Sequence, residues 1–374
     1  MKNMQPLKSA PKLMSAIVFR NYGDPQEVME LVDDRKIPKP NKNQVLVKIE
    51  CASINAADRY IARANYFIIR MVFGLFRPSK KKRILGMDIA GTIQLIGKNV
   101  KVFQIGDTVV ADIRKSFGGG FAEYAIVNAK HLVKKPETVS FEQAATVPIS
   151  GQAAMMGMTL CSINPGDKVL INGASGGVGS FGVQIAKSQG AYVTAICSTK
   201  KVNAVRSWGA DEIVDYKKKG SIKALKGNEF DAVFDTASFE CPGRYKQILK
   251  KDGKYVLVGG DFYNMLKLKL FGRFDRGSQK FMALTQEVEV TKNIKTVLEM
   301  IADKKINPAI QKVISLKDVP NAIHSLEQRT VVGTCLARSA TAMLNKSIHV
   351  YVSSCLVSDR LFASLASKKS TNPT

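Results

Sequence analysis

One stretch constrains the fold more than any other. Between Asp167 and Lys187 an apolar run, a cluster of glycines and an amphipathic segment follow one another. Val169 to Ile171 form a short apolar run of the kind that a parallel strand needs, and from Val178 onward apolar residues recur about once per helical turn. The stretch therefore predicts a buried strand, a tight turn and a helix.

The glycine turn between this strand and helix predicts a phosphate site. Glycines let the backbone bend tightly and approach a ligand, so that amide N–H groups and the positive end of the helix dipole face a diphosphate. A second strand candidate, Gly190 to Cys197, follows at the spacing of a βαβ dinucleotide unit. Alanine stands at the usual first glycine, and a turn without a ligand is the alternative. The expected cofactor-binding residues of the turn are Gly173, Ser175, Gly176, Gly177, Val178 and Gly179.

Composition bounds the class of protein. The 374 residues are 45% hydrophobic and 23% charged, which is enough for two domains with substantial cores. The formal net charge of +25 invites a polyanion or an anionic membrane as partner, but the cations are spread over many short runs, which favours a solvated basic surface. Six cysteines without a Cys-x-x-Cys pair suggest neither a zinc ribbon nor a disulfide framework. We expect reduced thiols in a cytosol-like compartment.

No segment has the pattern of a secretory signal or a membrane span. Met1 to Leu13 carries lysines and no acid, but lacks an apolar core. We expect a cytoplasmic protein, with an organelle presequence as the alternative. The most apolar stretch, Tyr66 to Phe76, is interrupted by Arg70 and is far shorter than the ~20 residues that cross a bilayer.

The order of apolar patterns predicts two domains of an α/β fold. Short strands at 16–19, 44–50, 89–96 and 107–110 precede Phe141, with no helix of useful length between them. From Phe141 onward helical and extended segments alternate, which predicts a doubly wound parallel sheet, and a last strand at 333–337 would return to the β-rich region. We expect a β-rich domain of residues 14–140 with 285–337, a nucleotide-binding domain of 141–284, and poorly ordered tails at 1–13 and 338–374.

Six segments together carry a resemblance to a known family. They are 47–58, 84–91, 100–107, 119–124, the glycine turn and 326–333. Over about residues 14 to 337 the chain resembles the zinc-free, quinone-oxidoreductase branch of the medium-chain dehydrogenase/reductase superfamily. The resemblance implies a GroES-like catalytic domain, a Rossmann domain that binds NADPH, and a homodimer.

The resemblance also predicts that no metal is bound. Zinc-dependent members of the superfamily have a cysteine ligand where this chain has Asn55, and Gly-His-Glu where it has Gly86, Met87 and Asp88. No cysteine occurs at 97–130, where a structural zinc lobe would fall. Zinc needs three or four ligands of fixed geometry, and His131 is the only histidine near these segments. We therefore expect a site without metal.

A site without zinc favours conjugated acceptors. Simple alcohol oxidation depends on zinc as a Lewis acid, whereas a quinone or an α,β-unsaturated carbonyl spreads the incoming charge and needs only hydrogen-bond donors. The resemblance places Asn55 and Tyr60 beside the nicotinamide, with Asn55 as a contact to the substrate or the nicotinamide ribose and Tyr60 as a proton donor. A turn asparagine and an aromatic packing residue are the alternatives.

The end of the second strand predicts NADPH as the cofactor. NAD-specific folds usually have an acid there, which binds the ribose 2′-hydroxyl. This chain instead has Ser198 followed by two lysines, which fits a 2′-phosphate. The resemblance assigns the phosphate to Lys201, Tyr216 and Arg329. We also assign Gly259, at the end of a later strand, to the cofactor site.

One position departs from the family. Ala153 stands where a threonine commonly lies beside the nicotinamide, and Ser150 and Gln152 are the candidates to replace its hydrogen bond.

Two other functions stay open: an NADPH-liganded protein that binds RNA, and a membrane-surface protein with little catalysis. No RNA-binding motif is visible, so we do not expect a nucleic-acid partner. Residues 66–83 and 265–276 mix bulky apolar side chains with cations, and we predict that both stretches dock on anionic membranes around the substrate cleft. Substrate lids and oligomer contacts give the same composition.

Overall fold

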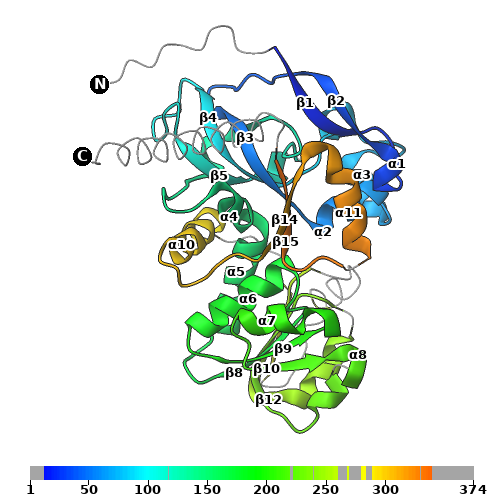
Figure 1. Ribbon diagram of the computed structural model, residues 1–374, viewed down its shortest axis with the longest axis vertical. Coiled ribbons are helices and arrows are strands. Elements are labelled where there is room, and N and C mark those ends of the chain that lie inside the picture. The colour runs from blue at the N-terminus through cyan, green and yellow to red at the C-terminus, as the bar shows by residue number, and fades with distance from the viewer. Residues whose placement is uncertain are drawn as a thin grey trace, which may run out of the picture.

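The computed structural model describes residues 12–116, 118–219, 222–238, 240–259, 268, 279–283, 289–328 and 330–338. These residues form a β-rich lobe and a lobe built on a parallel sheet, drawn in blue to cyan and in green in Figure 1. Nearly all of the two predicted tails lies outside the described residues, although Leu13 and Arg338 belong to strands.

The β-rich lobe contains a seven-stranded sheet in the order β14-β15-β3-β4-β5-β7, with β6 also paired to β3. The predicted return strand is confirmed, because β15 pairs antiparallel with β3. A separate two-stranded sheet is formed by β1 and β2, which pair antiparallel. The bounds are β1 (Leu13–Phe19), β2 (Met29–Lys36), β3 (Gln44–Ile54), β4 (Asp88–Ile96), β5 (Thr108–Asp112), β6 (Tyr124–Asn128), β7 (Leu132–Lys134), β14 (Ile310–Ser315) and β15 (Thr334–Arg338).

The prediction that no helix precedes Phe141 is wrong. The structure has α1 (Pro25–Val28), α2 (Ala56–Arg63) and α3 (Phe67–Phe73). Both longer segments are short, with eight residues in α2 and seven in α3, and α3 is apolar on nearly every side, so neither gives a helical pattern of useful length. Local capping decides instead: the Asp58 carboxylate accepts a hydrogen bond from the Asn55 N–H at 2.8 Å, at the start of α2.

The second lobe confirms the doubly wound prediction. Its six strands lie in the order β10-β9-β8-β11-β12-β13, and every neighbouring pair is parallel. Val169 and Ile171 belong to one core and Leu170 to the other, so this short apolar run is buried on both faces of the sheet. The bounds are β8 (Lys168–Asn172), β9 (Tyr192–Cys197), β10 (Glu212–Asp215), β11 (Phe230–Asp235), β12 (Leu249–Leu257) and β13 (Lys280–Ala283).

The helices of this lobe alternate with its strands as predicted. The helical region that begins at Phe141 is interrupted by the π-helical turn η4, and η7 (Pro242–Ile248) is a 3-10 segment. The other bounds are α4 (Phe141–Ala145), η4 (Val147–Gly151), α5 (Gln152–Cys161), α6 (Gly177–Ser188), α7 (Val202–Ser207), α8 (Tyr216–Lys219), α10 (Val290–Ala302) and α11 (Val319–Glu327).

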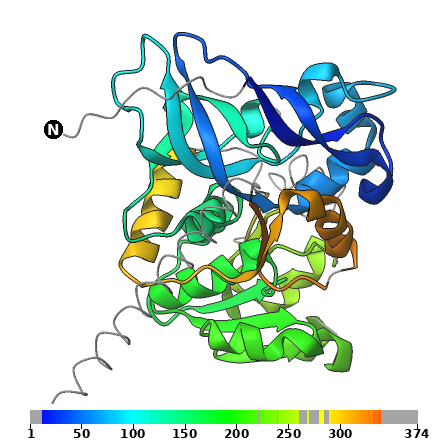
Figure 2. The same cartoon turned by 45° about the horizontal axis from the view of Figure 1, so that its top comes forward.

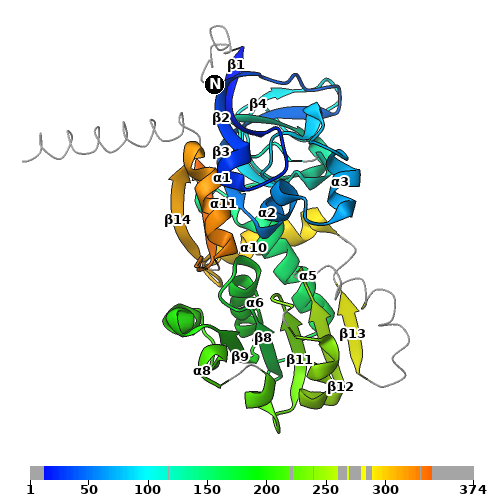
Figure 3. The same ribbon diagram turned by 90° about the vertical axis from the view of Figure 1, so that its right-hand side faces the viewer.

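The two lobes share one apolar core. Cys51, Ala90 and Val110 of the β-rich sheet belong to the same buried cluster as residues of α5, α6 and α10. Figures 2 and 3 show the orange return segment, with β14 and α11, alongside the junction between the lobes. The junction therefore has a fixed geometry on which a site can be built. The domain limits at 140 and 285 stay a prediction.

Candidate active site

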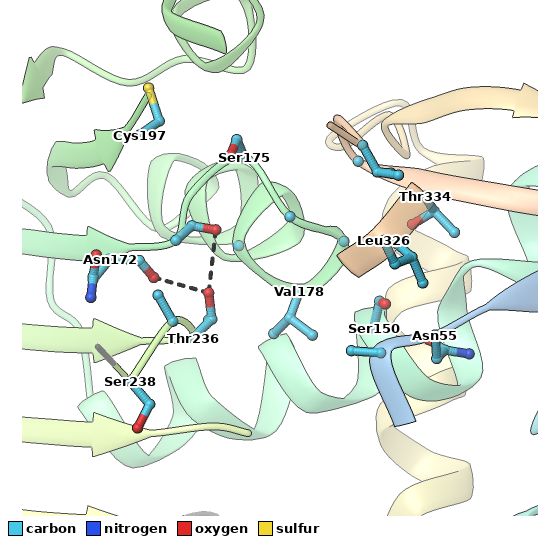
Figure 4. A pocket seen from close by; sticks show the side chains of 18 of the residues that line it. Asn55, Ser150, Asn172, Ser175, Val178, Cys197, Thr236, Ser238, Leu326 and Thr334 are labelled. Atoms are coloured by element: carbon cyan, nitrogen blue, oxygen red, sulfur yellow. Dashed lines mark hydrogen bonds between the residues drawn. The ribbon is translucent and has the colours of Figure 1, made fainter. Parts of the chain in front are cut away.

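A cavity of about 940 Å³ lies at the junction of the lobes. One side is formed by the carboxyl ends of β8, β9 and β11 and the start of α6, and the other by α2, η4 and the return segment (Figure 4). This position, at the carboxyl edge of a parallel sheet, is where doubly wound folds bind ligands. The volume is within the range of small-molecule and cofactor sites.

The glycine turn forms the floor of one end of the cavity, and all six predicted turn residues line it. Gly173 follows β8 with φ +77°, a conformation that side chains rarely adopt. A Cβ at Gly179 would lie 2.3 Å from the Gly173 carbonyl oxygen, so α6 approaches the strand as closely as a glycine allows. The first turn of α6 has backbone N–H groups without helical partners, which fits a bound diphosphate.

The residues predicted to hold a 2′-phosphate are only partly brought together. The cavity is lined by Ser198, Lys201 and Tyr216. Gly259, which the sequence assigned to the cofactor site, does not line it. Arg329 lies outside the described residues. The Lys201 ammonium donates to the Val331 carbonyl at 2.6 Å, and burial lowers the pKa of Lys201.

Asn55 lines the cavity from the start of α2, and its amide is fixed from behind. The Asn55 Nδ2 donates to Asp88 Oδ1 at 2.9 Å and to Ser53 Oγ at 3.1 Å, and Ser53 Oγ donates to Asp88 Oδ2 at 2.6 Å. In Figure 4 the amide nitrogen points away from the glycine turn. Because both amide hydrogens are used in this way, Asn55 Oδ1, which also takes part in the capping box at the start of α2, is the atom that can accept a further hydrogen bond.

The carboxyl groups of Asp58 and Asp88 lie behind Asn55 and are buried, and among the described residues neither forms an ion pair. Burial raises the pKa of Asp88 well above its usual range, with the Ser53 hydrogen bond opposing the shift. Burial also raises the pKa of Asp58 to about 7, although its carboxylate accepts from the Asn55 and Gly86 N–H groups. Asn55 and Asp88, at two of the positions compared with zinc ligands, are therefore bonded to each other. In the described ranges no group of three His, Cys, Asp or Glu side chains could hold a metal ion.

Tyr60 lies in the cavity within an aromatic group. Its ring is 5.9 Å from that of Tyr66, and the Arg59 guanidinium lies 4.4 Å above it. Ser150, on η4, also lines the cavity, whereas Gln152 is buried and directs its amide to the Met156 sulfur. Of the two candidates to replace the family threonine, Ser150 is the one at the cavity.

Several lining residues were missed from the sequence. Thr236 and Ser238 follow β11, and Asn172 ends β8. The Thr236 hydroxyl donates to the Asn172 carbonyl at 2.9 Å and to the Gly173 carbonyl at 3.3 Å, as Figure 4 shows. These three residues could have been predicted from the sequence, because the carboxyl ends of neighbouring parallel strands meet at one edge of the sheet. Leu326 and Thr334 also line the cavity; they lie in segments that the sequence singled out, but neither was assigned to the site.

No helix among the described residues has the length and apolar character needed to cross a bilayer.

Two family models match the chain. The alcohol dehydrogenase GroES-like domain matches residues 41–137, and a model described as zinc-binding dehydrogenase matches 208–335.

Curated relatives and a solved structure agree with these matches. A chloroplastic quinone-oxidoreductase of Triphysaria versicolor is 36% identical over 255 residues, which are 66% of this chain and 75% of the relative. A chloroplastic NADPH-dependent alkenal/one oxidoreductase of Arabidopsis thaliana is 33% identical over 67% of this chain and 64% of its own length. The structure of the quinone oxidoreductase from Coxiella burnetii superposes with a TM-score of 0.78 at 26% identity, over 87% of this chain and 99% of the other.

Proposed function

The chain belongs to the zinc-free, quinone-oxidoreductase branch of the medium-chain dehydrogenase/reductase superfamily, and from that premise we propose that it is an NADPH-dependent reductase of quinones or α,β-unsaturated carbonyls. That it is an oxidoreductase with a nicotinamide cofactor follows from the family. When bound, NADPH supplies a hydride, which carries two electrons and one proton to the acceptor. The reduced acceptor then takes up a second proton. The choice of NADPH over NADH and the acceptor class are the parts that we propose.

The choice of NADPH is supported by the side chains that line the cavity at the end of β9. They are Ser198, Lys201 and Tyr216, and no acidic residue of β9 lines the cavity. Glu240 also lines the cavity, but it is bound to Arg244 at 2.6 Å. Lys201 has three N–H donors and uses one on Val331, which leaves donors for a 2′-phosphate.

We assign the roles at the other end of the cavity by hydrogen-bonding capacity. Asn55 Oδ1 accepts from a hydroxyl of the nicotinamide ribose or the substrate. Tyr60 is the proton donor to the oxyanion that forms when the acceptor takes a hydride, and Ser150 is a second hydroxyl beside it.

Stopped-flow oxidation of NADPH and NADH against a panel of quinones and enones tests both parts of the proposal. We expect oxidation of NADPH by at least one acceptor class, with a lower apparent Kd for NADPH than for NADH. Equal Kd values would contradict the cofactor choice, and no turnover with any acceptor would contradict the reaction.

We further propose that activity does not depend on zinc. The Asn55 amide donates a hydrogen bond to the Asp88 carboxylate, and Met87 is not a usual zinc ligand. The purified enzyme should keep its activity in strong chelators and hold no stoichiometric zinc. One zinc per chain, lost together with activity, would contradict this.

A peripheral membrane contact is the second partner that we propose. Phe67, Met71 and Phe76, on or next to α3, are 65%, 64% and 87% exposed, and the run from Arg59 to Met87 contains no acid. Tyr66, at the start of α3, lines the cavity, so a lipophilic acceptor could enter beside this surface. Figure 3 shows α3 on the outside of the β-rich lobe. The second predicted stretch, 265–276, lies outside the described residues except for Leu268.

Flotation with anionic liposomes at low and high salt tests this contact. Binding should fade with salt, because each Lys or Arg near an anionic surface contributes about 1 kcal/mol that is screened. Replacing Lys80, Lys81, Lys82 and Arg83 by Ser should abolish it, and unchanged flotation would contradict the proposal. Sedimentation in the same buffer tests the predicted homodimer.

The RNA-binding alternative is not favoured by the relatives, whose names describe oxidoreductases. Both of these relatives are named as chloroplastic, which supports an organelle over the cytoplasm that the sequence first suggested. Fluorescence imaging of the full chain with a C-terminal tag decides between the two compartments.

A further inference from the structure

Arg59 is a charged side chain in the cavity for which the described residues provide no hydrogen-bond or ion-pair partner. Three charged residues line the cavity among the described residues, namely Arg59, Lys201 and Glu240. Lys201 binds the Val331 carbonyl and Glu240 binds Arg244. The Arg59 guanidinium makes no hydrogen bond or ion pair within the described part of the chain, and its one contact of note is the stack on Tyr60 at 4.4 Å.

Among the residues that the structure describes, no acid forms an ion pair with Arg59. Asp58 precedes it in α2, but its fully buried carboxylate is turned to the Asn55 and Gly86 N–H groups. From Arg59 to Met87 the chain has no Asp or Glu. Arg63, one helical turn further along, differs in this respect: it is bound to Asp24 at 2.7 Å and does not line the cavity.

The contact with the Tyr60 ring restrains the guanidinium. A cation over an aromatic face is held by the ring quadrupole, and the planar guanidinium keeps its N–H donors along its edge. Such an edge binds a carboxylate or sulfonate through two parallel hydrogen bonds. Tyr60 and Tyr66, with ring centroids 5.9 Å apart, offer aromatic surface to a planar acceptor at the same place.

We propose that Arg59 makes the enzyme selective for acceptors that carry an anionic group next to the conjugated ring or enone. This inference rests on the proposed reductase function, and it names the class of substrate that the same cavity prefers. Arg59 acts in binding, so its removal should raise the KM for anionic acceptors more than the KM for neutral ones.

Steady-state kinetics with a matched pair of acceptors tests the proposal. 1,2-Naphthoquinone-4-sulfonate carries the anion, and 1,2-naphthoquinone lacks it. For Arg59→Gln we expect the KM of the sulfonate to rise about tenfold, the factor that 1.4 kcal/mol makes, and the KM of the neutral quinone to change by less than about twofold. Arg59→Lys should lie between, because it keeps the charge and loses the planar fork. Arg63→Gln is the control and should leave the ratio of the two KM values unchanged.

A binding measurement separates this proposal from the reaction itself. Calorimetry with 2-naphthoate and 2-naphthamide, neither of which accepts a hydride under these conditions, uses the full chain saturated with NADP⁺. The wild type should bind the carboxylate more tightly than the amide, and Arg59→Gln should remove the difference. A preference that survives in Arg59→Gln, or none in the wild type, overturns the role of Arg59. Turnover of neither quinone, together with a lost carboxylate preference in Arg59→Gln, would overturn the reductase function alone.

Discussion

The two ends of the cavity are built in different ways. The nucleotide end is made of backbone: Gly173 and Gly179 bring a strand and a helix together, and the Thr236 hydroxyl binds two carbonyls of the same edge. The acceptor end is made of side chains on the short helix α2, fixed by hydrogen bonds to strands β3 and β4. A diphosphate needs N–H groups and space, whereas an acceptor needs particular side chains. The glycine turn alone would therefore serve any dinucleotide, the proposed role of Lys201 is to select NADPH, and the side chains of the acceptor end would determine the reaction.

The largest expected effect comes from Tyr60→Phe at the acceptor end. Loss of the proton donor should lower kcat about a hundredfold or more, since general acids contribute that much. The Kd of NADPH should not change, because the ring and its contacts with Tyr66 and Arg59 remain. Tyr66→Phe is the matched control. Full kcat in Tyr60→Phe would leave Tyr60 as a packing residue.

At the nucleotide end, Lys201→Ala should separate the two cofactors. Loss of a charge-assisted hydrogen bond should weaken NADPH binding by roughly 1.5–3 kcal/mol and leave NADH nearly untouched. Lys200→Ala, an exposed neighbour that does not line the cavity, is the control. Equilibrium fluorescence titration measures both Kd values. Equal losses for the two cofactors would show that Lys201 acts through its bond to Val331 instead.

Gly179→Ala tests whether the nucleotide end tolerates any side chain. The new Cβ would lie 2.3 Å from the Gly173 carbonyl oxygen, so backbone must move, at a cost of about 1–3 kcal/mol in the free energy of unfolding. Gly176→Ala is the contrast, because its Cβ would meet only that oxygen, at 3.6 Å. Urea unfolding of the two variants should differ in midpoint. Equal midpoints would mean that α6 can shift freely.

The smallest effect concerns the buried carboxyl under the acceptor end. The pKa of Asp58 is about 7 in the fold against 3.8 when exposed, so the folded state binds more protons between these values and stability falls as pH rises. From pH 6 to 7 this group should lower the free energy of unfolding by on the order of 1 kcal/mol. Asp58→Asn should remove that part of the slope. An identical slope in wild type and variant would show that Asp58 is already ionised.

The sequence was informative about the nucleotide end because its determinants are local. The turn around Gly176 and the strand before it lie within one short segment, and the return strand β15 carries its own apolar pattern. The acceptor end depends on contacts between distant segments. Asn55 was identified, but the direction of its amide is set by Asp88, which lies 33 positions away. Three other features also leave no periodic pattern in the sequence. They are the capping of α2, the π-helical turn η4 and the position of Thr334 in the cavity wall.

The return strand has a consequence for how the molecule is made. β15 pairs Cys335 with Ile54 and lies between β14 and β3, and Gly333 bridges to Gly176 of the glycine turn. During synthesis, chains emerge from the N-terminus, so the strand that joins both lobes leaves the ribosome after nearly all of its partners. Until then the edge of β3 that receives it is unpaired, and an unpaired edge is a site of aggregation. The nascent protein therefore keeps this edge of β3 exposed until residue 338 has been released.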